Sequence, residues 1–141
     1  MAQALAKHLR TSISGVASRH SVLVIEDDPL IGMLLIDYLE DLGFRVCGTA
    51  STEDRAVELA TLHQPDLITS DIQLARGDGV TAIRRIRFER WVPVLFVSGS
   101  LNNEARMFHD VARIAKPFDI GSLALGIAKA TAIDALNLRS A

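Results

Sequence analysis

The chain has 141 residues, enough for one folded domain, and 49% of them are apolar, which excludes a chain that is disordered throughout. The formal net charge of −2 gives no indication of a nucleic-acid partner, and the single cysteine, Cys47, excludes an intrachain disulfide and fits a reducing compartment, the cytoplasm. No apolar run reaches membrane-spanning length, and residues 1–20 lack the form of a signal peptide, so we expect no membrane association.

The first predicted strand follows residues 1–20, an N-terminal extension that we expect to be a short helix or disordered. Residues 22–25 form an apolar run typical of a strand that is buried on both faces. Pro29 suits the first position of a helix, which makes Asp28 the predicted N-cap. Gly43 is placed to end that helix in a left-handed conformation.

A second strand is expected at residues 44–48, and a second helix follows it. Ser51, with Asp54 three residues later, resembles a capping box at the start of this helix. The helix must end before Pro65, because a residue before proline avoids the helical conformation. A third apolar strand then ends at Asp71.

Asp78 is predicted to cap a helix at residues 80–88. Four arginines gather on and just after this helix, and two readings stay open for them, a solvated helix face or a docking patch. They are Arg84, Arg85, Arg87 and Arg90.

A fourth strand at residues 94–97 ends at Ser98, and a short, weak helix is expected to reach His109. The fifth strand, residues 111–115, ends at Lys116. Asp119 is predicted to cap a final helix, in which Leu125 and other apolar residues suggest little free surface.

Five strands thus alternate with five helices, a pattern that predicts an α/β fold with a parallel sheet and helices on both faces. In such a sheet the carboxyl ends of the strands lie at one edge, where α/β proteins place their chemistry. Four strand ends carry polar side chains that we expect to meet there. They are Glu26 with Asp27, Asp71, Ser98 and Lys116.

Carboxylates brought this close repel each other unless a cation lies between them, and hard oxygen ligands suit Mg²⁺. We therefore expect Asp27 and Asp71 on the metal and Glu26 nearby, although helix capping is an alternative for part of the acidic run. An aspartate beside Mg²⁺ and a lysine can attack phosphorus. In that reading Asp71 is the nucleophile, and Lys116 and Ser98 contact the phosphoryl oxygens.

The sequence resembles the receiver domains of two-component response regulators. The resemblance covers about residues 20–137 and is carried by five blocks in order, at residues 22–29, 66–71, 78–79, 93–99 and 116–118. The loop after Asp71 lacks the proline common there, as in an alphaproteobacterial variant of the family. The resemblance implies a flavodoxin-like (βα)5 fold, with a doubly wound parallel five-stranded sheet in the order 2-1-3-4-5.

The resemblance also implies that Asp71 accepts a phosphoryl group from a phosphohistidine on a sensor histidine kinase or a histidine phosphotransfer protein. It implies that Glu26, Asp27, Asp71 and the backbone carbonyl of Gln73 organise Mg²⁺. Ser98 and Lys116 become the switch hydroxyl and the phosphate partner, and the bond from Lys116 to Pro117 is expected to be cis.

Two departures from the family pattern stand out. Arg113 occupies the position that usually carries a switch aromatic, so the usual coupling of hydroxyl and ring is not assumed. The stretch between Ser98 and Lys116 is also shorter than usual, so we expect a reduced fourth helix.

We divide the chain into the extension 1–20, a receiver domain 21–137 and a tail 138–141. The favoured function is a stand-alone, single-domain response regulator that is not an enzyme and acts by protein contact or phosphorelay on an unknown downstream protein. The alternatives are an aspartyl-nucleophile phosphatase or phosphotransferase, and a pseudo-receiver that only binds partners. A homodimer stays open.

Overall fold

The computed structural model of the chain describes residues 20–99 and 111–140. It contains one parallel five-stranded sheet, in the order β2-β1-β3-β4-β5, which confirms the predicted topology. The strands are β1 (Ser21–Ile25), β2 (Arg45–Ala50), β3 (Leu67–Ser70), β4 (Val94–Ser98) and β5 (Ala112–Ala115).

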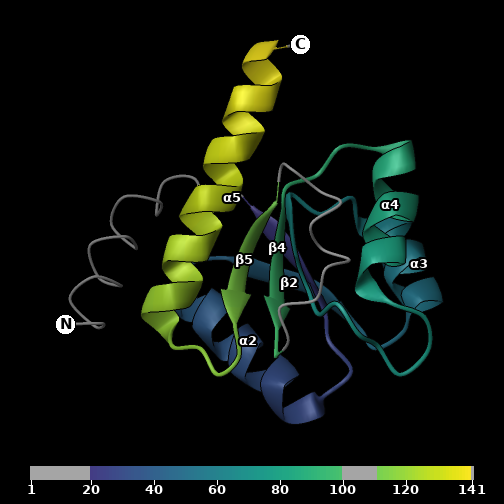
Figure 1. The fold of residues 1–141 in the computed structure, drawn as a ribbon, viewed down its shortest axis with the longest axis vertical. Coiled ribbons are helices and arrows are strands. Elements are labelled where there is room, and N and C mark those ends of the chain that lie inside the picture. The colour runs from purple at the N-terminus through teal and green to yellow at the C-terminus, as the bar shows by residue number, and fades with distance from the viewer. Residues whose placement is uncertain (1–19, 100–110, 141) are drawn as a thin grey trace.

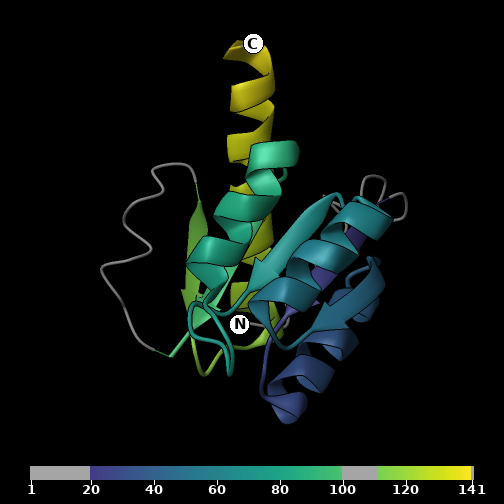
Figure 2. The same cartoon turned by 90° about the vertical axis from the view of Figure 1, so that its right-hand side faces the viewer.

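The helices of the described residues pack on both faces of this sheet. They are α2 (Pro29–Asp41), α3 (Glu53–His63), α4 (Gly79–Glu89) and α5 (Ile120–Ser140). Figures 1 and 2 show α3 and α4 side by side on one face and α2 and α5 on the other. The predicted helix ending near His109 falls outside the described residues.

Two cores, one on each face of the sheet, follow from the alternation of side chains along the buried strands. On β1, Leu23 and Ile25 pack under α3 and α4, whereas Val22 and Val24 pack under α2 and α5. All five β1 residues are buried. The apolar run at residues 22–25 is therefore explained by helices on both sides.

Polar caps fix where the helices begin. The Asp28 side chain accepts from the backbone N–H groups of Leu30 and Ile31, and Asp78 accepts from that of Thr81, as predicted for these two caps. Gly43 has the expected positive φ of 98°. The Asp119 side chain accepts from the N–H of Ser122 at the start of α5.

Three local predictions need correction. Helix α3 is capped by Thr52, which accepts from the N–H of Arg55, and not by Ser51, because the helix begins at Glu53, one residue later than a Ser51 cap requires. Strand β2 lies at Arg45–Ala50 instead of 44–48, since it pairs with β1 through to Ala50. Leu125 on α5 is 39% exposed, so this helix keeps a free face.

Helix α5 continues to Ser140, beyond residue 137, and Figure 1 shows it extending past the sheet. The division of the chain at residues 20 and 137 stays a prediction. Within residues 20–99 and 111–140, no helix combines the length and the apolar character needed to cross a membrane.

Candidate phosphoryl-acceptor site

The predicted site residues lie at the carboxyl edge of the sheet, directly after β1, β3 and β5 and, for Ser98, at the last residue of β4. Backbone hydrogen bonds extend the sheet pairing past the strand ends. The Asp71 N–H donates to the Ile25 carbonyl at 2.9 Å, and the Lys116 N–H donates to the Ser98 carbonyl at 2.9 Å. The register of neighbouring strands therefore sets where these side chains emerge.

The Lys116 ammonium joins two of the acids. Its Nζ donates to Glu26 Oε1 at 2.5 Å and to Asp71 Oδ2 at 2.9 Å. The Glu26 side chain is only 1% exposed, and its second oxygen accepts from the Asp28 N–H at 3.1 Å. The lysine is thus anchored on a buried carboxylate and reaches Asp71 from there. The peptide bond from Lys116 to Pro117 is cis, as expected.

Burial and pairing shift the ionisation of this group. Desolvation raises the pKa of Glu26, and the hydrogen bonds from Lys116 and from the Asp28 N–H offset only part of that effect. Burial by itself lowers the pKa of Lys116, but its hydrogen bonds to Glu26 and Asp71 outweigh burial and raise the pKa overall. The lysine therefore stays charged at neutral pH.

The acidic residues fit a divalent cation. Glu26, Asp27 and Asp71 each offer a carboxylate oxygen, and these oxygens lie within 4.8 Å of one another. Oxygen donors of this hardness suit Mg²⁺, which is bound by one or two carboxylates and retains several waters. Glu26, Asp27 and Asp71 are therefore the residues that would hold it.

A cavity of about 440 Å³ opens at this edge, lined by Asp27, Asp71, Gln73, Ser98 and Lys116 among others. The structure thus brings together the predicted residues, with Glu26 buried beside Lys116 instead of lining the cavity. The Gln73 N–H donates to Asp71 Oδ1 at 3.3 Å, which places the Gln73 backbone beside the Asp71 carboxylate.

One contact near the site was not predicted. Glu53, which the sequence gave no reason to single out, contacts the loop after Asp71. An acidic residue at the start of a helix is expected because a negative charge is favourable at the helix N-terminus. That local rule does not predict the contact of Glu53 with Asp78, 25 residues away.

The arginines on and after α4 make contacts within the molecule. Arg87 donates to the Val92 carbonyl, and its guanidinium lies 4.0 Å from the Trp91 ring centroid. Arg90 donates to the Pro65 carbonyl at 2.7 Å. Arg87 and Arg90 therefore also have a structural role, which neither interpretation from the sequence included.

A family model of the response regulator receiver domain matches residues 22–127. The chain belongs to this family. Among curated proteins, the transcriptional regulatory protein PdtaR of Mycobacterium tuberculosis is 36% identical over 117 residues, 80% of this chain and 57% of that protein. The receiver domain thus spans about half the length of that relative.

Solved structures agree with the receiver fold. The receiver domain of the PhyR response regulator from Erythrobacter litoralis superposes with a TM-score of 0.71 at 34% identity, covering 83% of this chain and 92% of that one. PhyR from Brucella abortus gives a TM-score of 0.73 at 29% identity, covering 92% of this chain and 56% of that one.

Proposed function

We propose that the protein is a response regulator in which Asp71 accepts a phosphoryl group, in the presence of Mg²⁺, from a phosphohistidine on a histidine kinase or a phosphotransfer protein. The observation that supports this most strongly is the contact of Lys116 with both Glu26 and Asp71, beside the carboxylate of Asp27. A cation and an acceptor carboxylate are then already paired where a phosphoryl group would bind.

In the proposed step an Asp71 oxygen forms a bond to phosphorus while the phosphorus–nitrogen bond of the phosphohistidine breaks. The departing imidazole nitrogen keeps the electron pair. Mg²⁺, held by Glu26, Asp27, Asp71 and the Gln73 carbonyl, would supply positive charge that neutralises the phosphoryl oxygens.

Lys116 supplies the second positive charge. Its ammonium stays bonded to the buried Glu26 carboxylate and exchanges its contact with Asp71 for one with a phosphoryl oxygen. The Ser98 hydroxyl, at the same cavity, donates to another phosphoryl oxygen. The new negative charge thereby favours a conformation in which Ser98 and Lys116 are drawn toward Asp71, which is a shift between existing states.

The output that we propose is a protein contact or an onward phosphotransfer that depends on this state. A solved structure similar to this chain, PhyR of Bartonella quintana, is described as an anti-anti-sigma factor, and this supports output through a protein partner. The downstream partner of this receiver domain is accordingly expected to be a protein.

The experiment is incubation of the chain with a small phosphodonor and Mg²⁺, read by intact mass. The expected result is one added phosphoryl group, lost on chelation of the metal and absent in Asp71→Asn. Labelling that persists in Asp71→Asn excludes Asp71 as the acceptor. Sustained turnover of a generic phosphomonoester would instead indicate a phosphatase, and absence of Mg²⁺ binding would indicate a pseudo-receiver.

A further inference from the structure

Glu53, the first residue of α3, holds the loop that joins Asp71 to α4. Its backbone N–H donates to the Arg76 carbonyl at 3.1 Å, and its side-chain Oε1 accepts from the Asp78 N–H at 3.3 Å. The preceding residue, Thr52, forms a parallel bridge with Arg76. The loop is therefore attached to the start of α3 through both main chain and side chain.

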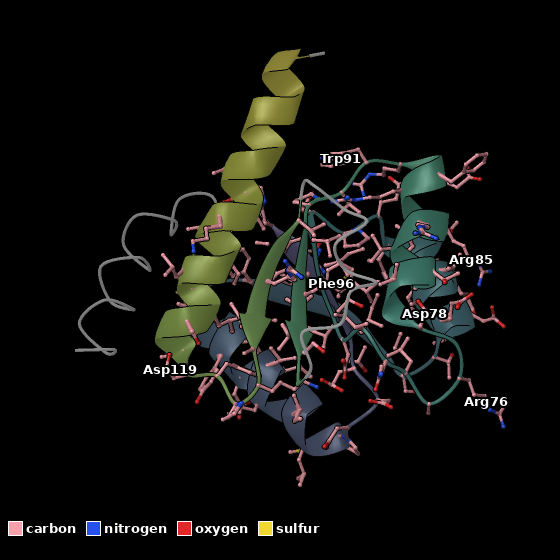
Figure 3. The ribbon with its side chains drawn as sticks, in the orientation of Figure 1. Arg76, Asp78, Arg85, Trp91, Phe96 and Asp119 are labelled. Carbon is pink, nitrogen blue, oxygen red and sulfur yellow. The ribbon has the colours of Figure 1, made fainter. Side chains whose placement is uncertain are left out.

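The second oxygen of Glu53 is held by a cation on α4. Arg85 Nη1 donates to Glu53 Oε2 at 2.8 Å and to Asp54 Oδ1 at 2.8 Å. The hydrogen bonds with Asp54 and Glu53 raise the pKa of Arg85, so this cation is permanent. Figure 3 shows Arg76, Asp78 and Arg85 on the side of the molecule that carries α3 and α4.

The loop backbone lies directly against Glu53. Gly77 has a φ of 80°, in the left-handed region, and a Cβ atom built on it would lie 2.5 Å from the Cβ of Glu53. A residue with a side chain could not occupy this position without moving Glu53 or the loop. Glycine therefore allows the close approach that the two hydrogen bonds require.

A short path connects this attachment to the acceptor. Asp78, which Glu53 holds, forms an antiparallel bridge with Gln73, and the Gln73 N–H donates to Asp71 Oδ1 at 3.3 Å. At the far end of the loop, a Cβ on Gly79 would lie 1.7 Å from the Asp71 carbonyl oxygen. We therefore expect a displacement of Asp78 to shift both Gln73 and the backbone of Asp71.

We propose that Glu53 is a positioning residue for the metal and acceptor site, acting through Asp78 and Gln73 without touching the metal or the phosphoryl group. The inference rests on the proposed function, because it assigns Glu53 the task of keeping the Gln73 backbone beside Asp71. Arg85 orients the Glu53 carboxylate for this task.

The test is a Mg²⁺ titration of the full chain, followed by backbone amide chemical shifts, together with the rate of labelling by a small phosphodonor as a function of Mg²⁺. We expect Glu53→Ala to weaken Mg²⁺ binding about 10-fold, the lower end of what is typical for residues that support metal ligands from behind. Because added metal restores the loop geometry, the labelling rate at saturating Mg²⁺ should change much less. Glu53→Gln keeps an acceptor for the Asp78 N–H and should lie between Glu53→Ala and the wild type.

Two controls separate positioning from general weakening of the fold. Glu58 lies on the same helix and pairs with Arg55, so Glu58→Ala removes a carboxylate that does not reach the loop. Asp66 accepts from the Ser21 N–H at 3.0 Å, so Asp66→Ala weakens the fold at the opposite end of the sheet. Both should bind Mg²⁺ like the wild type.

Wild-type Mg²⁺ affinity in folded Glu53→Ala, or equal loss of affinity in Asp66→Ala, overturns the inference and leaves the proposed function standing. A wild-type chain that neither binds Mg²⁺ nor becomes labelled overturns the proposed function and the inference with it. Should Glu53→Ala fail to fold, Glu53→Gln carries the same comparison.

Discussion

Lys116 and Asp71 lie 45 residues apart in the chain, yet the lysine amine donates to the aspartate carboxylate at 2.9 Å. The same amine donates to Glu26, so the two carboxylates share a single cation and keep a net negative charge before any ligand binds. A divalent metal that binds these acids competes with the lysine for Asp71, and a phosphoryl group on Asp71 would attract both. Removal of the lysine should therefore affect metal binding and phosphoryl transfer in opposite directions.

Lys116→Met should change Mg²⁺ affinity and the labelling rate in opposite directions. Without the amine, Glu26 and Asp71 have no fixed counter-charge, so Mg²⁺ should bind more tightly, while the labelling rate at saturating Mg²⁺ should fall on the order of 100-fold, as when a donor to a developing anionic oxygen is removed. Amide-shift titration and time-resolved intact mass measure the two quantities. Lys129→Met, an exposed lysine on α5, is the matched control. Labelling of Lys116→Met at the wild-type rate would remove the lysine from the reaction.

Exposed apolar side chains on the first turns of α2 lie next to the acidic site and suit a protein donor. Leu30 is 77% exposed and Met33 is 63% exposed. Both are close in the chain to the acidic residues, because α2 begins directly after Asp28. Leu30→Ala with Met33→Ala should slow phosphotransfer from a protein donor about 10-fold, the cost of losing one interface anchor, and should leave labelling by a small donor unchanged.

Leu62→Ala is the control for that pair, because Leu62 is 70% exposed on α3 and does not adjoin the site. Its phosphotransfer rate should match the wild type with both donors. An equal slowing of Leu62→Ala with the protein donor, or slowing of the α2 variant with the small donor, would contradict a docking role for Leu30 and Met33.

Two helical glycines should respond oppositely to alanine. Gly32 on α2 has nothing within 4 Å of a built Cβ, so Gly32→Ala should raise the free energy of unfolding by about 0.5–1 kcal/mol, since alanine loses less backbone entropy. A Cβ on Gly126 would lie 2.9 Å from Ile114 Cγ2 and from Leu95 Cδ1, so Gly126→Ala should lower it by about 1–3 kcal/mol. Urea denaturation measures both, and a stable Gly126→Ala would show that α5 can move away from the sheet.

Cys47 should react slowly in the folded protein. Burial raises the pKa of its thiol, and the Sγ donates to the Val22 carbonyl at 3.4 Å. Between the thiol pKa of the unfolded chain and that of the folded chain, alkylation by iodoacetamide should be slower in buffer than in urea. The same shift lowers stability as pH rises through this window, because only the unfolded chain gains by losing the proton. Cys47→Ala should not show this loss.

Much of the site could be predicted from the polar residues that follow the apolar runs in the sequence. Asp71, Ser98 and Lys116 each come at or directly after the end of a strand, and parallel strands bring such ends together. Asp28 before Pro29 identified a helix start, because side-chain capping and the fixed φ of proline are local effects. Local chemistry and strand alternation therefore predicted a parallel sheet with helices on both faces and Asp71 at its carboxyl edge, whereas the strand order was predicted from the family resemblance.

Contacts between distant segments could not be read in this way. Ser51 and Thr52 are both suitable caps by residue type, and the structure starts the helix at Glu53 with Thr52 as its cap and in a bridge with Arg76. The pairing of Glu53 with Arg85 depends on how α3 packs beside α4, which no spacing in the sequence encodes. Leu125 looks like a core residue by composition, but its place on α5 leaves it partly in solvent.

The strand order leaves β2 and β5 as the two outermost strands, and each presents an exposed arginine, Arg45 and Arg113 respectively. A charged side chain on an edge strand disfavours the addition of a strand from another molecule, because the charge would lose its hydration when the new strand covers it. We therefore expect Arg113, which takes the place of a switch aromatic, also to disfavour pairing of β5 with a strand of another molecule. Replacing Arg113 with an aromatic residue should then lower the solubility of the protein, and an assay of phosphorylation alone would not detect this loss.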